Sequence, residues 1–334
     1  MNTKPLKLVV AALLLTVATS TARAITYKTL DDPGSIRTDA FGISGNNIVG
    51  MYANSFYHGF LYDGTTYTPI DNPAATNFTV ASGIDGNNIV GDYSDSSGKD
   101  HGFLYNGSSF TTLDDPLGVN RVVAGVVEAT SPLGISGNNI VGLYYDSSDV
   151  VHGFLYNGAT WTPLDFPGST YTDAFGISGN RIVGSYADAA GNKHGYLYDD
   201  SAYTTLDAPL GTKGTFASGI DGNNIVGSYT DASGLSHGFL YNGSAYTTLD
   251  DPSAGPVGTV GNYSGSNGTS ASAISGNNIV GYYIDSSGFE HGFEATVPEP
   301  SSLMLIVLAF LAVVVGGRRL STRNNAREPL HLRP

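Results

Sequence analysis

One unit is written six times along this chain, and this repeat limits the possible folds more than any other feature. A string close to Gly-Ile-Ser-Gly-Asn-Asn-Ile-Val-Gly starts at Gly42, Gly83, Gly134, Gly176, Gly219 and Ala273. A His-Gly-Phe or His-Gly-Tyr string follows it at His58, His101, His152, His194, His237 and His291. A third string, close to Tyr-Thr-Thr-Leu-Asp-Asp-Pro, recurs at Tyr27, Tyr67, Phe110, Trp161, Tyr203 and Tyr246. A period of roughly 40 residues is typical of solenoids and propellers.

Each unit predicts four short strands. In the fifth unit we expect them at 215–220, 225–229, 236–241 and 245–249, where β-branched and aromatic residues are concentrated. The segments between the strands are turn sequences such as Asn242-Gly243, in which Gly and Asn accept the positive φ of tight hairpins. Pro252 ends the unit, because proline cannot continue a β-ladder.

Four strands per unit favour a propeller blade. Helical repeats are excluded, because Gly and Asn recur every few residues and no apolar pattern of helical period persists. The mature chain opens with a fourth-type strand at 27–31, whereas the last unit has no fourth strand after Phe293. The sequence therefore predicts an all-β, six-bladed β-propeller at 25–296. Its N-terminal strand would complete the last four-stranded blade and remove the open sheet edges.

The N-terminus has the order of a secretory signal peptide. Lys4 and Lys7 precede a short apolar run at 8–17, and Ala22-Arg23-Ala24 supplies the small residues of a cleavage site. The apolar run is too short to span a hydrocarbon core of about 30 Å, which disfavours a membrane anchor. We expect residues 1–24 to be removed during export.

The C-terminus predicts a transmembrane helix and a cytoplasmic tail. An apolar run at 303–315, extended by small residues to 301–317, is just long enough to span the membrane. Arg318, Arg319 and Arg323 follow it, and the positive-inside rule places this basic end, including residues 321–334, in the cytoplasm. Everything before Val297 then lies outside, in agreement with a signal peptide.

The segment 297–320 resembles the PEP-CTERM sorting signal of Gram-negative bacteria, through Val-Pro-Glu-Pro-Ser, the apolar helix and the basic cluster. The resemblance implies that an exosortase, an integral-membrane protease, recognises Pro298, Glu299 and Pro300 and releases the protein to the cell surface. In that family, sorting often accompanies exopolysaccharide production. The implied partners are the exosortase, the secretion machinery and, before processing, the membrane.

The repeats over 25–295 resemble the extracellular HAF-type repeats of bacterial surface proteins, with His-Gly-Phe in place of His-Ala-Phe. This second resemblance implies export and a repeated architecture, but no defined activity.

Composition limits the partners further. The chain has no Cys, so an exported domain must be held together by its core rather than by disulfides. Residues 25–297 carry seven Lys and Arg against 27 Asp and Glu, a balance of −20. This charge repels nucleic acid and anionic lipid, which leaves cations and basic or neutral polymers as direct partners.

Aspartates gather in two loops that share one face of an up-and-down propeller. These are the b–c loop, between the second and third strands of a blade, and the d–a loop, from the fourth strand to the next blade. The b–c candidates for cation or ligand contact are Asp95, Asp146, Asp188, Asp231 and Asp285. Two insertions, around 118–131 and 253–270, fall in d–a loops, and insertions confined to one face commonly mark a binding face. One hypothesis is that this face binds Ca²⁺ or a calcium-bridged polysaccharide. The alternative is that each Asp caps its own turn.

The remaining polar residues do not predict catalysis. The repeated histidines could form a metal ring, but we expect each one to bond to a neighbouring loop, because the third strand is not innermost. Of the unrepeated residues, Arg121 and Glu128 lie in the first insertion and are candidate ligand contacts, while Glu290 and Glu294 lie elsewhere. No catalytic triad, zinc motif or phosphate loop stands out. We therefore predict a surface protein without a cofactor other than Ca²⁺, used for adhesion or for binding polysaccharide or protein. The alternatives are a lyase or hydrolase acting on extracellular polysaccharide, and a passive coat component.

Overall fold

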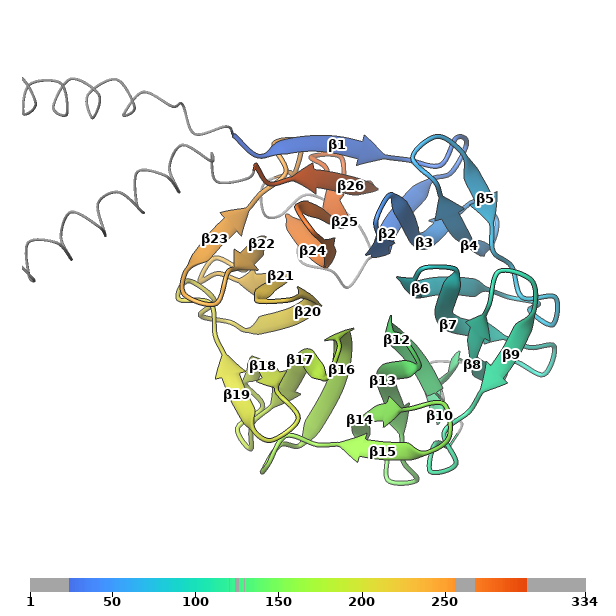
Figure 1. Cartoon of the computed structure of the whole chain (residues 1–334). Helices are drawn as coiled ribbons and strands as arrows, with labels where there is room; N and C mark the ends of the chain where they lie inside the picture. The colour runs from blue at the N-terminus through green and yellow to red at the C-terminus, as the bar shows by residue number, and fades with distance from the viewer. Residues whose placement is uncertain (1–23, 120, 124–125, 129, 256–267, 299–334) are drawn as a thin grey trace, which may run out of the picture. The chain divides into compact units, whose positions relative to one another are not determined.

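The repeated unit folds into a ring of four-stranded antiparallel sheets (Figure 1). The computed structural model describes residues 24–119, 121–123, 126–128, 130–255 and 268–298, and only the backbone of 121–123 and 126–128. Within these residues, Thr26–Thr296 forms one compact unit that contains six such sheets. The all-β, six-bladed propeller predicted from the repeat is confirmed.

The blades follow one another in chain order, and each runs from its innermost to its outermost strand (Figure 1). Blade 1 comprises β2 (Arg37–Ser44), β3 (Asn47–Ala53), β4 (Tyr57–Tyr62) and β5 (Tyr67–Pro69). Blade 2 comprises β6 (Thr79–Asp85), β7 (Asn88–Ser94), β8 (Asp100–Tyr105) and β9 (Phe110–Leu113). Blade 3 comprises β12 (Thr130–Ser136), β13 (Asn139–Tyr145), β14 (Val151–Tyr156) and β15 (Trp161–Leu164). Blade 4 comprises β16 (Tyr171–Ser178), β17 (Arg181–Ala187), β18 (Lys193–Tyr198) and β19 (Tyr203–Leu206).

Blade 5 comprises β20 (Thr215–Asp221), β21 (Asn224–Thr230), β22 (Ser236–Tyr241) and β23 (Tyr246–Leu249). Its third strand has the predicted bounds; the first and fourth differ from the predicted ranges by one residue at one end, and the second by one residue at both ends. Blade 6 comprises β24 (Thr269–Ser275), β25 (Asn278–Ile284) and β26 (Glu290–Thr296) from the end of the chain. The first insertion contains a separate hairpin of β10 (Arg121–Val123) and β11 (Val126–Glu128).

The N-terminal strand β1 (Thr26–Leu30) completes blade 6. It pairs antiparallel with β26, and the register places Thr26 opposite Thr296 and Leu30 opposite Gly292. The strand lies one residue earlier than the predicted 27–31. Leu30 is 2% exposed and joins a buried cluster with Ile48 and Phe60 of blade 1 and Val280 of blade 6.

Aromatic residues of the third strands form the centre of each blade. The first aromatic residue of the His-Gly-Phe or His-Gly-Tyr string is fully buried in all six blades, at Phe60, Phe103, Phe154, Tyr196, Phe239 and Phe293. The outermost strand covers this ring edge-on in several blades, as Trp161 covers Phe154 with ring centroids 4.9 Å apart. Aromatic pairs in this geometry add to the stability that comes from burial.

The innermost strands explain the glycine-rich string. A Cβ placed on Gly83 would lie 2.7 Å from the carbonyl oxygen of Leu133 and 3.1 Å from Cα of Gly134 in the next blade. Neighbouring blades therefore approach here at backbone distance, and a larger residue would force them apart.

The Ser or Asp of the same string links each blade to another. Its side chain accepts a hydrogen bond from the backbone N–H of a turn glycine, as Asp85 does from Gly137 at 2.6 Å and Ser178 does from Gly222 at 3.4 Å. Ser275 of blade 6 accepts the corresponding bond from Gly45 of blade 1 at 3.1 Å. Ser and Asp can replace one another at this position because both supply an acceptor oxygen.

Candidate functional site

The predicted b–c loop aspartates cap their own loops. Oδ1 of Asp95 accepts hydrogen bonds from the backbone N–H groups of Ser97 at 2.8 Å and Lys99 at 3.0 Å, and also from the Ser97 hydroxyl. The bond from the Ser97 hydroxyl, followed by that from Lys99, holds the pKa of Asp95 well below its ordinary value. The same Oδ1 capping occurs at Asp146, Asp188, Asp231 and Asp285. This geometry favours the turn-capping interpretation for one oxygen of each carboxylate.

Each repeated histidine bonds to the aspartate that follows the fourth strand of its blade, as predicted. The Nδ1 atoms lie 2.9–3.0 Å from a carboxylate oxygen in the pairs His58–Asp71, His101–Asp114, His152–Asp165, His194–Asp207, His237–Asp250 and His291–Asp31. In blades 2 to 6, Nε2 also faces the b–c aspartate at 3.4–3.6 Å. A tyrosine stacks on the ring, as Tyr229 does on His237 with centroids 5.1 Å apart. The histidines therefore hold the b–c and d–a loops together within one blade.

The other predicted site residues are placed only in part. The β10–β11 register puts Arg121 opposite Glu128, and their role as ligand contacts remains a prediction. Pro298 is described, whereas Glu299 and Pro300 lie outside the described residues, as do the predicted transmembrane helix and cytoplasmic tail and all but Ala24 of the signal peptide.

No helix in the described part of the chain is long and apolar enough to cross a membrane. In the same residues, no group of three or more His, Asp or Glu is arranged to hold a metal ion. Calcium binding stays a prediction.

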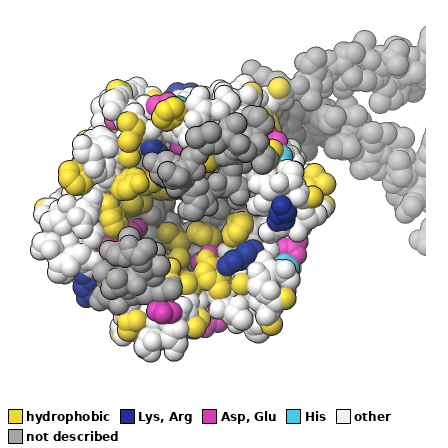
Figure 2. Space-filling view, turned by 180° about the vertical axis from the view of Figure 1, so that it is seen from behind, with side chains coloured by type: hydrophobic (Ala, Val, Ile, Leu, Met, Phe, Trp, Pro, Cys, Tyr) yellow, Lys and Arg dark blue, Asp and Glu magenta, His cyan; other side chains and the backbone are white. Residues whose placement is uncertain are grey.

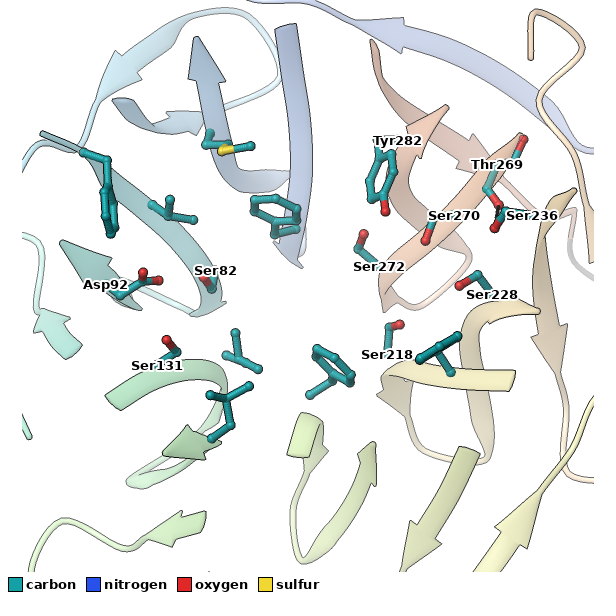
Figure 3. Close-up of a pocket in the computed structure, with 18 of the residues that line it drawn as sticks. Ser82, Asp92, Ser131, Ser218, Ser228, Ser236, Thr269, Ser270, Ser272 and Tyr282 are labelled. Atoms are coloured by element: carbon teal, nitrogen blue, oxygen red, sulfur yellow. Dashed lines mark hydrogen bonds between the residues drawn. The ribbon is translucent and has the colours of Figure 1, made fainter. Parts of the chain in front are cut away.

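A cavity of about 700 Å³ lies among the innermost strands, with one wall rich in hydroxyl groups and one wall of mixed polar and apolar side chains (Figure 3). Blades 5 and 6 line it with the hydroxyl groups of Ser218, Ser228, Thr230, Ser236, Thr269, Ser270, Ser272 and Tyr282. Blades 1 to 3 contribute the apolar side chains of Phe41, Met51, Phe78, Val80, Leu133 and Leu143. The same wall also carries the polar side chains of Ser82, Asp92, Asp100, Ser131 and Tyr145, and Phe216 adds an aromatic ring to the wall of blades 5 and 6. We call this space the central cavity. Figure 2 shows the ring hollowed at its centre, with apolar side chains around the hollow.

Several hydroxyls of the central cavity are available to a ligand. Ser218, Ser228 and Ser272 are half-buried, and their hydroxyl groups have no hydrogen-bond partner among the described residues. Buried polar groups in proteins are normally hydrogen-bonded to protein or water. A ligand that carries several hydroxyl groups could satisfy these serines while its apolar face packs on the opposite wall.

A second pocket, of about 580 Å³, lies where blade 6 meets blade 1, and we call it the seam pocket. Its lining includes Ile36, Phe56, Tyr57 and Phe289, which are 64%, 57%, 40% and 57% exposed. These are four of the six most exposed large apolar side chains among the described residues. Monomeric proteins rarely gather exposed apolar side chains in this way without a binding role.

An ion-paired cluster lies at the seam pocket. Arg37 Nη2 lies 2.7 Å from Oδ2 of Asp39, and Arg37 Nε lies 3.0 Å from Oε2 of Glu290 in the neighbouring blade. The three side chains are 23%, 0% and 11% exposed, respectively. Burial, and then the adjacent Asp39 carboxylate, raise the pKa of Glu290 to about 8, against the opposing effect of Arg37. Glu290 therefore carries a proton near neutral pH, next to a carboxylate and a guanidinium.

This raised pKa predicts a pH dependence of stability. Glu290 binds its proton more tightly in the folded state than in the unfolded chain, whose ordinary pKa is 4.5. The stability that Glu290 contributes is thus fully present below pH 4.5 and is lost as the pH rises through about 8. We expect the free energy of unfolding of the Glu290→Gln propeller, measured by urea unfolding, to fall less as the pH rises than that of the unchanged propeller, because the contribution of Glu290 is missing.

Glu294→Gln, the same change on the same strand, is the control. Burial also raises the pKa of Asp173 to about 6. The stability that Asp173 contributes is likewise lost as the pH rises, but at lower pH, and this loss should persist in both variants. An unchanged pH profile in Glu290→Gln would contradict the assignment.

Sequence reasoning did not identify the seam pocket, although a signal was present. Five residues separate Tyr52 from His58 in blade 1, whereas seven separate the corresponding Tyr and His in each of the other five blades. The shortened loop carries Phe56, and Asn54 takes the place of the capping aspartate, its Oδ1 accepting a hydrogen bond from the backbone N–H of Phe56 at 3.2 Å. The departure from the repeat was therefore the informative feature, whereas the prediction concentrated on the repeated aspartates.

Comparisons with known proteins identify the C-terminal segment. Residues 296–319 match the PEP-CTERM protein-sorting motif, which confirms the resemblance inferred for 297–320. The match does not extend to the repeats, so their HAF-type character stays a prediction. No similar sequence is found among curated proteins.

Several solved structures share the propeller architecture. Trypanosoma rangeli sialidase is 12% identical, with a TM-score of 0.48, and the match covers 94% of this chain but only 64% of the sialidase. The six-bladed fucose-recognising lectin of the fungus Aleuria aurantia is 14% identical, with a TM-score of 0.46 over 80% of this chain and 93% of the lectin. The SapL1 lectin is 15% identical, with a TM-score of 0.48 over 80% of this chain and 98% of the lectin. Similarity this low says nothing about the function of this chain.

The chain therefore carries a PEP-CTERM protein-sorting motif after a six-bladed β-propeller, and that motif marks an exported protein sorted to the cell surface.

Proposed function

We propose that this protein is a non-enzymatic surface or matrix protein whose propeller binds a neutral extracellular polysaccharide. The observation that carries the proposal is the central cavity, in which a wall rich in hydroxyl groups faces a mixed wall with several large apolar side chains (Figure 3). Sugar rings present hydroxyl groups at their edges and C–H groups on their faces, so both walls have a complement in the same ligand. The balance of −20 in residues 25–297 disfavours an anionic polymer.

Export and sorting agree with this assignment. We infer that exosortase recognises Pro298, Glu299 and Pro300 while the C-terminal helix holds the chain in the inner membrane, and that processing then releases the propeller. A protein delivered in this way would meet the polysaccharide outside the cell. The acidic b–c and d–a loops remain available for a calcium-dependent contribution.

The test is co-sedimentation and calorimetry of the propeller, residues 25–297, with the host's own extracellular polysaccharide, in calcium and in chelator. We expect saturable binding. Ser228→Ala combined with Ser272→Ala removes two hydroxyl groups that would bond to the ligand, at about 0.5–1.5 kcal/mol each, so affinity should fall on the order of tenfold. Ser244→Ala, in an exposed turn of blade 5, is the matched control.

Two outcomes would overturn the proposal. The absence of saturable binding under either condition would leave a passive structural role. Release of new reducing ends during incubation would instead show a polysaccharide-cleaving enzyme, for which Glu290 would be the first acid to replace.

A further inference from the structure

The central cavity and the seam pocket are neighbours. Phe78 lines both, so no more than one side chain separates them. The backbone at Phe78 forms a parallel bridge to Tyr57, which lines the seam pocket from blade 1. On β3, Met51 lines the central cavity and Ala53, two residues further along the strand, lines the seam pocket. The two spaces therefore adjoin at Phe78.

The two spaces provide complementary contacts. The central cavity supplies unpartnered serine hydroxyls, whereas the seam pocket supplies exposed aromatic rings at Phe56 and Phe289 beside the polar side chains of Asn54 and Asn77. Their volumes, about 700 and 580 Å³, each lie in the range of a small-ligand site of about 300–1,000 Å³. Each space is thus large enough to hold its own part of a longer chain.

We propose that the central cavity and the seam pocket are consecutive subsites of one binding cleft, joined past Phe78, which holds an extended segment of a neutral polysaccharide. The proposal rests on the proposed function and specifies its ligand as a chain rather than a single sugar unit. Sugar units in the central cavity bond to its serines, and the following units pack their C–H faces on Phe56 and Phe289.

Among the described residues, the junction of blades 6 and 1 differs from the other blade junctions in its b–c loop. The other b–c loops are two residues longer than that of blade 1 and begin with the capping aspartate. The blade 1 loop instead presents Phe56 and is followed directly by Tyr57 at the start of β4. This loop therefore distinguishes one of six similar blades as the side on which the polymer would extend out of the central cavity.

The experiment uses the propeller alone, because Thr26–Thr296 contains all of its own sheets. The probe is the host's extracellular polysaccharide, partially hydrolysed in acid and separated by chain length, and calorimetry gives the affinity of each fraction. We expect affinity to rise with length until the chain spans both subsites, and then to level off. Phe56→Ala combined with Phe289→Ala should lower the affinity of the long fractions at least tenfold and leave the shortest binding fraction unchanged.

Two further variants make the test specific. Replacing residues 54–57 by the six-residue loop 95–100 of blade 2 should abolish the gain in affinity with chain length, because it removes Phe56 and Tyr57 from the seam pocket. The variant should still fold, because it introduces a loop that the fold already accepts in blade 2. Leu117→Ala combined with Leu210→Ala removes two equally exposed apolar side chains from other loops, and should change nothing.

The outcomes separate this inference from the proposed function. If short fractions bind and neither chain length nor the seam variants alter affinity, the extended cleft is wrong while polysaccharide binding stands. If no fraction binds, the proposed function fails and the cleft fails with it.

Discussion

Replacing Arg37 by Met should lower the free energy of unfolding of the propeller by about 3–5 kcal/mol, because it removes the cation from a buried cluster and leaves its two acids behind. Asp39 is fully buried and Glu290 is 11% exposed, so water entering from the seam pocket would replace the guanidinium only in part. The loss should be largest above the pKa of Glu290, where both carboxyl groups would be charged. Urea unfolding followed by tyrosine fluorescence provides the measurement.

A compensated variant distinguishes charge from packing. Blade 2 carries Val80 where blade 1 carries Asp39, and blade 3 carries Val151 where blade 6 carries Glu290. The triple change Arg37→Met, Asp39→Val and Glu290→Val should recover most of the stability, since apolar replacements of a buried ionic cluster are often neutral or stabilising. Lys213→Met, on the exposed surface, is the control for loss of a positive charge. If the triple variant were no more stable than Arg37→Met, the loss would come from packing instead.

Removing the N-terminal strand should have the second large effect. Without Thr26–Leu30, the outer edge of β26 loses its five-residue ladder and the buried cluster at the junction loses Leu30. Leu30→Ala alone should cost about 2–5 kcal/mol, as for other fully buried leucines, and the deletion should cost more. The exposed strand edge should also promote association, because unpaired edges template pairing with another chain. Thermal unfolding and light scattering measure the two effects.

Complementation in trans provides the control for this deletion. A synthetic peptide of residues 26–31 should restore the melting temperature and the monomeric state of the truncated propeller. The same peptide with Leu30→Ala should do so only weakly. A truncated propeller that remains monomeric and as stable as the full one would show that β1 is dispensable.

The fold was predictable because the same strand and turn sequences recur in six units. Turn sequences such as Asn242-Gly243 separate the strands, and Pro252 ends the unit. The unmatched fourth-type strand at the N-terminus predicted the pairing of β1 with β26, which no single unit could have indicated. The strand ends differed by one residue in places, because hydrogen bonding extends into the turn residues, as at Asp221 and Asn224.

The candidate site was less predictable, for a physical reason. The predicted aspartates recur, and recurrence at Asp95 and its counterparts reflects a loop that each blade must cap. The second subsite that we propose lies where the symmetry of the ring fails, at Phe56 and Glu290. Glu290 was noted as unrepeated, but its neighbour Arg37 lies more than 250 positions away in the sequence, so only the closed ring brings them together.

The pairing of the first strand with the last has a consequence for timing. His291 and the Asp31 that it contacts are 260 residues apart in the sequence, and contacts between distant residues form slowly. A chain that leaves the cell N-terminus first exposes β1 early, yet its partner β26 arrives last and ends at Thr296, where the sorting motif begins. Completion of the ring and arrival of the sorting signal are therefore nearly simultaneous. An exosortase that acts promptly would meet a propeller that has only just become able to close.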